Sequence, residues 1–358
     1  MRWLRRRDPP PLGVHADPVG FPGVRFFSED GEEALTRFVG ELPTRPLAAH
    51  GDRLTVLALS GGGAGGAFGA GALVGLTKGG ERPTFDMVTG VSTGALIAPF
   101  ALLGPEWDGR LTDAYTDGEA SELLALTGLR PGPSLYASEP LTNLVERYID
   151  AALLEAVGLA HREGRRLFVA TANLDAQAIC IWDMGAIAAR GGDAALRLFI
   201  DVLIASASLP GVFPPKMIAV ESQGRQFEEM HVDGGTISPL FVVPEPLLLR
   251  KAEDWEGRTV EVYALINTTL HPEPRATPLM AVPILVNSFE LMLRSSYRSA
   301  LRSVAAFCEI NDFTFYTAAV PPEFSGGSML RFDQPLMARM FEHGVELGES
   351  KRLWSKPA

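Results

Sequence analysis

The chain has 358 residues, of which 46% are hydrophobic and 21% charged, a composition typical of folded globular proteins. Its formal net charge of −11 argues against a nucleic-acid partner, because binding to phosphates requires clustered Lys and Arg. The two cysteines, Cys180 and Cys308, are too few for a disulfide framework. Metal sites use more Cys or His at ligand spacing, so we expect two core residues and no metal.

The N-terminus carries a basic cluster, Arg2 to Arg7, with two interpretations: a frayed terminus, or a contact with anionic lipid. No apolar run follows this cluster, so we expect no cleavable secretory signal. Apolar runs such as AVPILV at Ala281 to Val286 fall far short of the roughly 20 residues that a membrane span needs. The sequence therefore predicts a cytoplasmic or membrane-peripheral protein.

A βαβ unit follows a segment that is rich in Pro, Gly and charge. Residues 1–51 are predicted to form an N-terminal extension with one short helix at Glu32 to Val39. LTVLAL, at Leu54 to Leu59, is a continuous apolar strand of the kind that is buried in a parallel sheet. A glycine-rich turn, an apolar helix at Phe68 to Leu76 and a strand at Phe85 to Val91 complete the unit.

The alternation of strands and helices continues along the chain. A helix is predicted at Ala194 to Ala205, and strands at Arg166 to Leu174, Glu229 to Asp233 and Thr259 to Asn267. A long helix is predicted from after Pro283 to about Phe307, and a late edge strand at Asp312 to Val320. We therefore expect an α/β fold in one domain over residues 52–320, followed by a C-terminal tail over residues 321–358.

The pentapeptide GVSTG contains a serine between two glycines. Ser92 lies between a predicted strand and an apolar helix at Thr93 to Leu103, and Gly90 and Gly94 flank it. A nucleophile elbow needs this context, because the serine sits in a strained turn where larger neighbours would clash. The helix N-terminus behind the serine also favours negative charge that develops nearby. The pattern predicts that Ser92 is a nucleophile.

Acyl transfer also needs backbone N–H groups that point at the developing oxyanion. SGGGAGGAFGAG, which begins at Ser60, supplies a glycine-rich turn after a strand and before a helix. Its Gly61, Gly63 and Gly66 also satisfy the dinucleotide-binding pattern G-x-G-x-x-G, with Asp86 about 20 residues further on. Asp86 stands near the start of its strand, however, which is the wrong end for a contact with ribose.

The candidate bases are Asp233 and His231, in the segment MHVDGG. Asp233 ends a strand, and Gly234 and Gly235 after it permit the close approach of another backbone. Parallel sheets gather functional residues at the carboxyl ends of their strands, so we expect Ser92 and Asp233 to meet there. His231 points to the same face but is expected about 6.5 Å further back along the strand, below the site.

Four segments in this order resemble the patatin-like phospholipase family: GGGAGG at residue 61, GVSTG at residue 90, ASASLPGVFPP at residue 205 and DGG at residue 233. The resemblance spans about Leu54 to Asn267. It implies a three-layer α/β/α sandwich with a mostly parallel central sheet.

The resemblance also implies a catalytic mechanism. Ser92 would be the nucleophile and Asp233 the general base of a Ser-Asp dyad, without a catalytic histidine. The oxyanion loop would comprise Gly61, Gly62, Gly63 and Ala64, with the N–H groups of Gly62 and Gly63 as donors and Ala64 as a further donor. The implied reaction is hydrolysis of lipid acyl esters through an acyl-serine, of the phospholipase A or lysophospholipase type, without a cofactor.

Two positions depart from the family pattern. Gly65 stands where the family often has Lys or Arg, and TISPL, at Thr236 to Leu240, replaces the common Asn before a proline. The alternatives in the enzyme class are an acyltransferase and a thioesterase. Outside that class they are a nucleotide-binding protein that uses the glycine-rich turn, and a catalytically silent scaffold.

Overall fold

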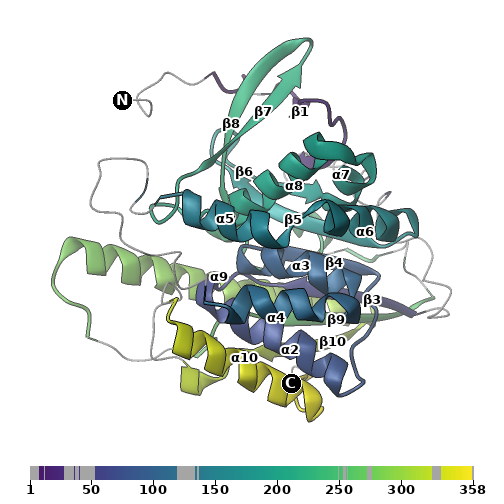
Figure 1. Cartoon of the computed structure of the whole chain (residues 1–358), viewed down its shortest axis with the longest axis vertical. Coiled ribbons are helices and arrows are strands. Elements are labelled where there is room, and N and C mark those ends of the chain that lie inside the picture. Colours follow the sequence, from purple (N-terminus) through teal and green to yellow (C-terminus); the bar gives the residue numbers. More distant parts are fainter. Residues whose placement is uncertain are drawn as a thin grey trace.

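The computed structural model describes residues 8–356 except residues 12, 28–35, 37–39, 41–52, 119–133, 135–136, 249, 253–254, 256, 272–275 and 325–331. Ten strands of this part form one mixed sheet, in the order β1-β7-β8-β5-β4-β3-β9-β10, with β2 and β6 joined to it through β5 (Figure 1). Five of them are parallel to one another: β5 (Arg166–Asn173), β4 (Met87–Val91), β3 (Arg53–Leu59), β9 (Thr259–Ile266) and β10 (Thr314–Ala319).

Antiparallel strands extend the sheet beyond β5. These are β8 (Arg225–Asp233), β7 (Lys216–Ser222), β6 (Ala178–Asp183), β2 (Arg25–Phe27) and β1 (Asp17–Pro18). The expectation that Asp233 ends a parallel strand is therefore wrong, because β8 runs against β5. A strand that follows β7 through a short hairpin is antiparallel to it, and the hairpin was not foreseen because β7 was not predicted.

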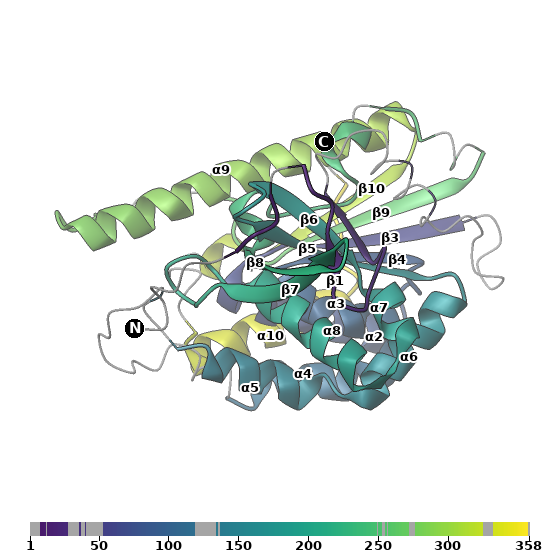
Figure 2. The ribbon, with the colours of Figure 1, turned by 90° about the horizontal axis from the view of Figure 1, so that it is seen from above.

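Helices cover both faces of the sheet, so the fold has three layers, α/β/α. Alternate residues of β3 divide between two cores: Leu57 and Leu59 face one, Val56 and Ala58 the other. On the first side lie α2 (Gly66–Lys78), α3 (Thr93–Leu103), α6 (Ala151–Arg162), α7 (Met184–Arg190), α8 (Gly192–Ala207) and α10 (Gln334–Glu349). On the other side α9 (Ala281–Ile310) crosses the sheet (Figure 2).

The strands and helices predicted from Leu54 onward are confirmed, with small differences at their ends. The helix expected at Glu32 to Val39 lies almost entirely outside the described residues. Five further α-helices of the described residues were not predicted: α4 (Asp108–Thr116), α5 (Glu139–Tyr148), α6, α7 and α10. Among the described helices, none has the length and apolar character needed to cross a membrane.

Both terminal regions contribute to the fold. β1 and β2, within residues 1–51, pair with β7 and β6. α10, within residues 321–358, packs against α2 so closely that a Cβ on Gly71 or Gly75 would lie 2.0 or 2.3 Å from a carbonyl oxygen of α10. The division into extension, domain and tail stays a prediction, and residues 41–52 at its first boundary lie outside the described part.

Candidate active site

Ser92 occupies the sharp turn between β4 and α3. Its φ of 57° and ψ of −127° place a non-glycine residue in a strained backbone conformation. The Ser92 N–H donates to Ser206 Oγ at 3.0 Å, and Ser206 Oγ donates to the Ala170 carbonyl at 2.8 Å. These bonds tie the elbow to α8 and β5, so the strained turn is held from outside.

The two glycines around Ser92 allow this turn to form. A Cβ on Gly90 would lie 2.7 Å from Ala95 Cα, and one on Gly94 would lie 2.3 Å from the Leu59 carbonyl oxygen. No side chain fits at such distances, because backbone atoms cannot move aside without breaking the turn. The GxSxG pattern therefore reflects close contact of the elbow with its own helix and with β3.

Asp233 meets Ser92 because β4 and β8 lie along the same edge of β5. β4 pairs with β5 as far as Val91 opposite Ala170, and β8 takes over at Asp233 opposite Thr171. β6 occupies the other edge over this whole stretch. The ends of β4 and β8 consequently face each other, and Ser92 Oγ donates to Asp233 Oδ2 at 2.5 Å.

Asp233 is buried, with 3% of the residue's surface exposed. Burial raises the pKa of Asp233 from 3.8 to about 7, although hydrogen bonds from Ser92 and Gly235 act in the opposite direction. The Gly235 N–H donates to Oδ1 at 2.7 Å and thereby orients the carboxyl group. The next residue, Gly234, has no room for a side chain, because a Cβ there would lie 2.5 Å from the Ala170 carbonyl oxygen.

The glycine-rich turn lies beside Ser92 and lines the same pocket with Gly61, Gly62 and Gly63. The Gly61 N–H donates to the Pro239 carbonyl at 3.0 Å, so it is already engaged. Gly62 and Gly63 have φ of 153° and 56°, which L side chains rarely adopt. Ala64 is the middle residue of the short helical turn Gly63–Gly65 that leads into α2, and it is buried.

Three residues that the sequence did not single out shape the glycine-rich turn or the elbow at Ser92. Asn267 follows β9, and its side-chain N–H donates to the Ser60 carbonyl at 2.7 Å while its backbone N–H donates to Ser60 Oγ at 2.9 Å. Tyr297 of α9 lines the pocket, and its hydroxyl would lie 3.0 Å from a Cβ on Gly61. Ser206, which holds the elbow, is the third; it lies in the predicted segment ASASLPGVFPP.

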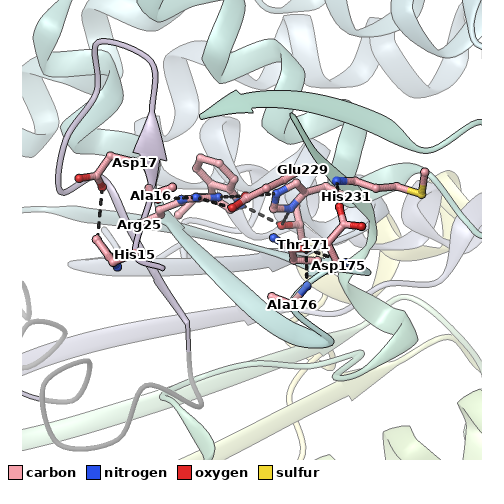
Figure 3. Close-up of polar contacts among 12 residues, drawn as sticks. His15, Ala16, Asp17, Arg25, Thr171, Asp175, Ala176, Glu229 and His231 are labelled. Carbon is pink, nitrogen blue, oxygen red and sulfur yellow. Dashed lines mark hydrogen bonds and ion pairs between the residues drawn. The ribbon is translucent and has the colours of Figure 1, made fainter. Parts of the chain in front are cut away.

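His231 does not contact Ser92 and belongs to a buried polar network (Figure 3). Its Nδ1 is hydrogen-bonded to Thr171 Oγ1 at 2.9 Å and its Nε2 to Glu229 Oε2 at 3.1 Å. Arg25 of β2 donates to both Glu229 oxygens, at 2.5 and 3.0 Å. Burial lowers the pKa of His231, so the imidazole is neutral at pH 7.

The expected position of His231 needs a correction that follows from the direction of β8. His231 pairs with Asn173 and Asp233 with Thr171, so His231 lies further toward the carboxyl end of β5, not toward its start. The alternation along β8 still puts the two residues on one face. Its contacts make His231 a structural residue that links β8, β5 and β2.

Asp86 is far from the glycine-rich turn. It immediately precedes β4, and its Oδ2 accepts a hydrogen bond from the Thr55 N–H near the start of β3 at 2.8 Å. The glycine-rich turn follows the opposite end of β3. An acidic residue so placed does not reach a ribose bound at that turn, so the dinucleotide pattern lacks its acidic partner.

The pocket around Ser92 is mainly apolar and continues into a second cavity. Leu96, Leu141, Leu209 and Phe213 are among the residues that line the first. The second cavity shares Gly63, Thr93, Leu96 and Phe332 with it and adds the side chains of Ala114, Tyr115, Leu144, Val145, Tyr148 and Met337. Such a surface fits a hydrocarbon chain.

The sequence analysis also made predictions about the two cysteines and about metal sites. Cys180 and Cys308 are both buried and neither forms a disulfide, which confirms the expectation of core residues. Across the described residues, no group of three or more His, Cys, Asp or Glu side chains is arranged to hold a metal ion.

Comparison with known proteins gives one family. No curated protein matches the chain. Among solved structures, VipD from Legionella pneumophila aligns with 12% identity and a TM-score of 0.44, over 84% of this chain and 66% of its own. The chain thus spans just under two thirds of the length of that protein. A model of the patatin-like phospholipase family matches residues 57–244, and the chain belongs to this family.

Proposed function

We propose that the chain is a serine acyl hydrolase that cleaves the fatty-acyl esters of phospholipids or lysophospholipids with a Ser92–Asp233 dyad. The observation that carries the proposal is the 2.5 Å hydrogen bond from Ser92 Oγ to a buried carboxylate. Membership of the patatin-like phospholipase family supports the reaction class. The proposal assigns this chemistry to the domain of residues 52–320.

In the first half-reaction Asp233 accepts the proton of Ser92 as Oγ attacks the ester carbonyl carbon. The pKa of a general base works best near the working pH, and the pKa of Asp233, about 7, meets that condition. The departing alcohol takes the proton from Asp233 and leaves an acyl-serine. In the second half-reaction Asp233 takes a proton from water as the water oxygen attacks the acyl carbon. Asp233 then returns this proton to Ser92 Oγ as the bond to the acyl group breaks, which releases the fatty acid and restores Ser92.

The oxyanion is assigned to the N–H groups of Gly62 and Gly63, with Ala64 as a further donor. The Gly61 N–H is engaged with Pro239, so Gly61 holds the turn in place. Pro239 lies in TISPL, one of the two departures from the family pattern, and its carbonyl gives that segment a role in supporting the turn. Gly65 is also restricted, because a Cβ there would lie 2.0 Å from the Asn267 carbonyl oxygen.

The two adjoining apolar cavities support a fatty-acyl substrate. Leu96 lies where they meet, so an acyl chain that starts at Ser92 runs past it toward Leu144 and Tyr148. Burial of each methylene of such a chain contributes about 0.8 kcal/mol, which favours long chains over short ones.

Labelling with a fluorophosphonate tests the assignment. The probe should modify Ser92, and Ser92→Ala should lose both labelling and esterase activity, whereas Ser350→Ala, at an exposed serine after α10, should keep both. Labelling of another serine, or full activity of folded Ser92→Ala, would contradict the proposal. Product analysis with and without an added alcohol or thiol acceptor separates hydrolysis from acyl transfer.

A further inference from the structure

Exposed apolar side chains are concentrated on the first half of α9 and on the two residues before it. Of the eleven large hydrophobic side chains that are exposed in the described residues, six lie in the short segment before Leu293: Leu279, Met280, Ile284, Leu285, Leu291 and Met292. Leu279 is 95% exposed and Met292 69%. The other five are scattered over the fold, so this segment differs from an ordinary surface.

This half of α9 also lacks surface charge. The sequence from Leu279 to Leu293 contains a single charged residue, Glu290, and that side chain is buried. Both ribbon views show the beginning of α9 extending past the sheet and past the other helices (Figures 1 and 2). An apolar helix that extends from the body costs free energy in water, so a partner that covers it would be stabilising.

The second half of α9 carries a row of arginines. Arg294, Arg298 and Arg302 follow one another at intervals of four residues, which places them along one side of the helix. That side continues the exposed apolar one, because Leu291 and Arg298 are seven residues apart. None of the three arginines has a hydrogen-bond or ion-pair partner within the described part of the chain, although the protein has a net charge of −11.

The opposite side of α9 reaches the candidate active site. Leu293 and Tyr297 line the pocket that contains Ser92, while Val304, Phe307 and Cys308 are buried against the sheet. The same helix therefore has an exposed outer side and an inner side that forms part of the pocket wall. A partner bound to the outer side would lie next to the pocket.

We propose that the outer side of α9 docks on a lipid surface that carries anionic headgroups. Ile284 and Leu291 would enter the boundary between headgroups and acyl chains, and Leu285 and Met292 would follow on the adjacent side. The guanidinium groups of the arginine row would bind headgroup phosphates or carboxylates, as amphipathic helices with basic sides do. The positive charge of the three arginines favours an anionic surface. The position of the pocket on the same helix favours a surface that supplies lipid esters, and this part of the inference rests on the proposed function.

Cosedimentation with vesicles tests the inference independently of catalysis when the parent protein is Ser92→Ala. The vesicles are phosphatidylcholine alone or with about one third phosphatidylserine. The parent should bind the anionic vesicles more strongly. Leu291→Gln with Met292→Gln should reduce binding to both kinds of vesicle at least about fivefold, through the loss of apolar burial.

Arg298→Gln with Arg302→Gln should reduce binding to the anionic vesicles only, and about 1 M NaCl should remove the difference from the parent by screening. The matched control is Leu159→Gln with Leu174→Gln, which changes two exposed leucines outside α9 and should bind like the parent. Deletion of residues 1–8 serves as a second control, because it removes the N-terminal basic cluster.

The inference is overturned if the α9 variants bind like the parent, or if the deletion of residues 1–8 alone removes binding. It is also overturned if the parent binds no vesicles and is instead a dimer that the α9 variants dissociate, since α9 would then cover a second copy. In the active protein, the α9 variants should hydrolyse a water-soluble ester normally and a vesicle ester more slowly. Absence of all esterase activity would contradict the proposed function and leave the binding result intact.

Discussion

The carbonyl oxygen of Asn267 lies 1.9 Å from the point where a Cβ on Gly62 would stand. The glycine-rich turn is thus pressed against the residue that follows β9, and the Asn267 side chain holds Ser60 in the same contact. Residue 62 must be glycine for two reasons: a side chain would collide with this backbone, and its φ of 153° is one that other residues rarely adopt. The conformation of the turn, and with it the direction of its N–H groups, depends on this contact.

Gly63→Val should lower kcat/KM for an ester about 100-fold, because a side chain there tilts the oxyanion donors, and one lost donor costs about 3 kcal/mol. The strain of a β-branched residue at positive φ must be separated from this effect. Gly80→Val is the matched control: Gly80 also has positive φ, 69°, but it follows α2 and a Cβ there meets open space. Equal loss of activity in both variants would show that strain alone is responsible.

Asp233→Asn should abolish turnover, because an amide keeps the shape of the carboxyl group but does not accept a proton at neutral pH. In the parent protein kcat/KM should rise with pH around a midpoint of about 7, since the base must be ionised. A pH–rate profile measures this. A midpoint near 4, or activity in folded Asp233→Asn, would assign the base elsewhere.

The same residue should make the protein less stable as the pH rises. The folded state holds the Asp233 proton more tightly than the unfolded state, since the pKa is about 7 instead of 3.8. This contribution is fully present below about pH 4 and is lost as the pH rises toward 7. Asp233→Asn should therefore exceed the parent in unfolding free energy at pH 8, by up to about 4 kcal/mol, and match it at pH 4. Urea titrations at the two pH values provide the test.

His231→Ala should keep the pH–rate profile of the parent, because His231 bonds to Thr171 and Glu229 and not to Ser92. It should cost about 1–3 kcal/mol of stability for each buried partner left unsatisfied. If instead the variant is folded and inactive, a Ser-His mechanism replaces the dyad.

Arg25→Met should destabilise the fold by about 3–5 kcal/mol, because it leaves the buried Glu229 carboxylate without its cation. Although burial acts to raise the pKa of Glu229, hydrogen bonds from His231 and Arg25 lower it to about 2, so the group is ionised at pH 7. Adding Glu229→Gln to Arg25→Met should recover much of the loss. A denaturant midpoint that the double change does not improve would argue against a buried ion pair.

Leu144→Trp should shorten the preferred acyl chain, because a larger side chain fills the second cavity beyond Leu96. We expect kcat/KM to fall about tenfold for a dodecanoyl ester and to change little for a butanoyl ester. Leu159→Trp, at an exposed site on α6, is the control. A uniform change for both esters would place the acyl chain elsewhere.

The sequence predicted the elements around Ser92 well because each has a strong local signal. The apolar run of β3, the glycines of the turn and the apolar α3 all lie within 50 residues. It failed at the direction of β8, because strand direction depends on β7, whose sequence KMIAVES has exposed and half-buried positions and a weak apolar pattern. The contacts of Asn267 and Tyr297 were also missed, since both residues reach the turn from distant parts of the chain.

The buried network of Arg25, Glu229 and His231 was also missed, because its residues come from distant parts of the chain. His231 and Asp233 share the alternation of one strand, so the sequence could not separate them by face. Their roles differ because β2 brings Arg25 against Glu229, while β4 brings Ser92 against Asp233. Both are side-chain contacts between residues that lie far apart in the sequence, separated by 204 and 141 positions.

The packing of α2 against α10 determines when, during synthesis, the glycine-rich turn beside Ser92 can reach its final conformation. Gly71 and Gly75 contact α10 directly, and Gly344 in turn contacts the backbone of α2, so neither helix surface is complete without the other. During synthesis α2 leaves the ribosome long before α10 exists. Because α2 continues the turn beside Ser92, the nascent chain is expected to gain hydrolytic competence only after α10 has been made.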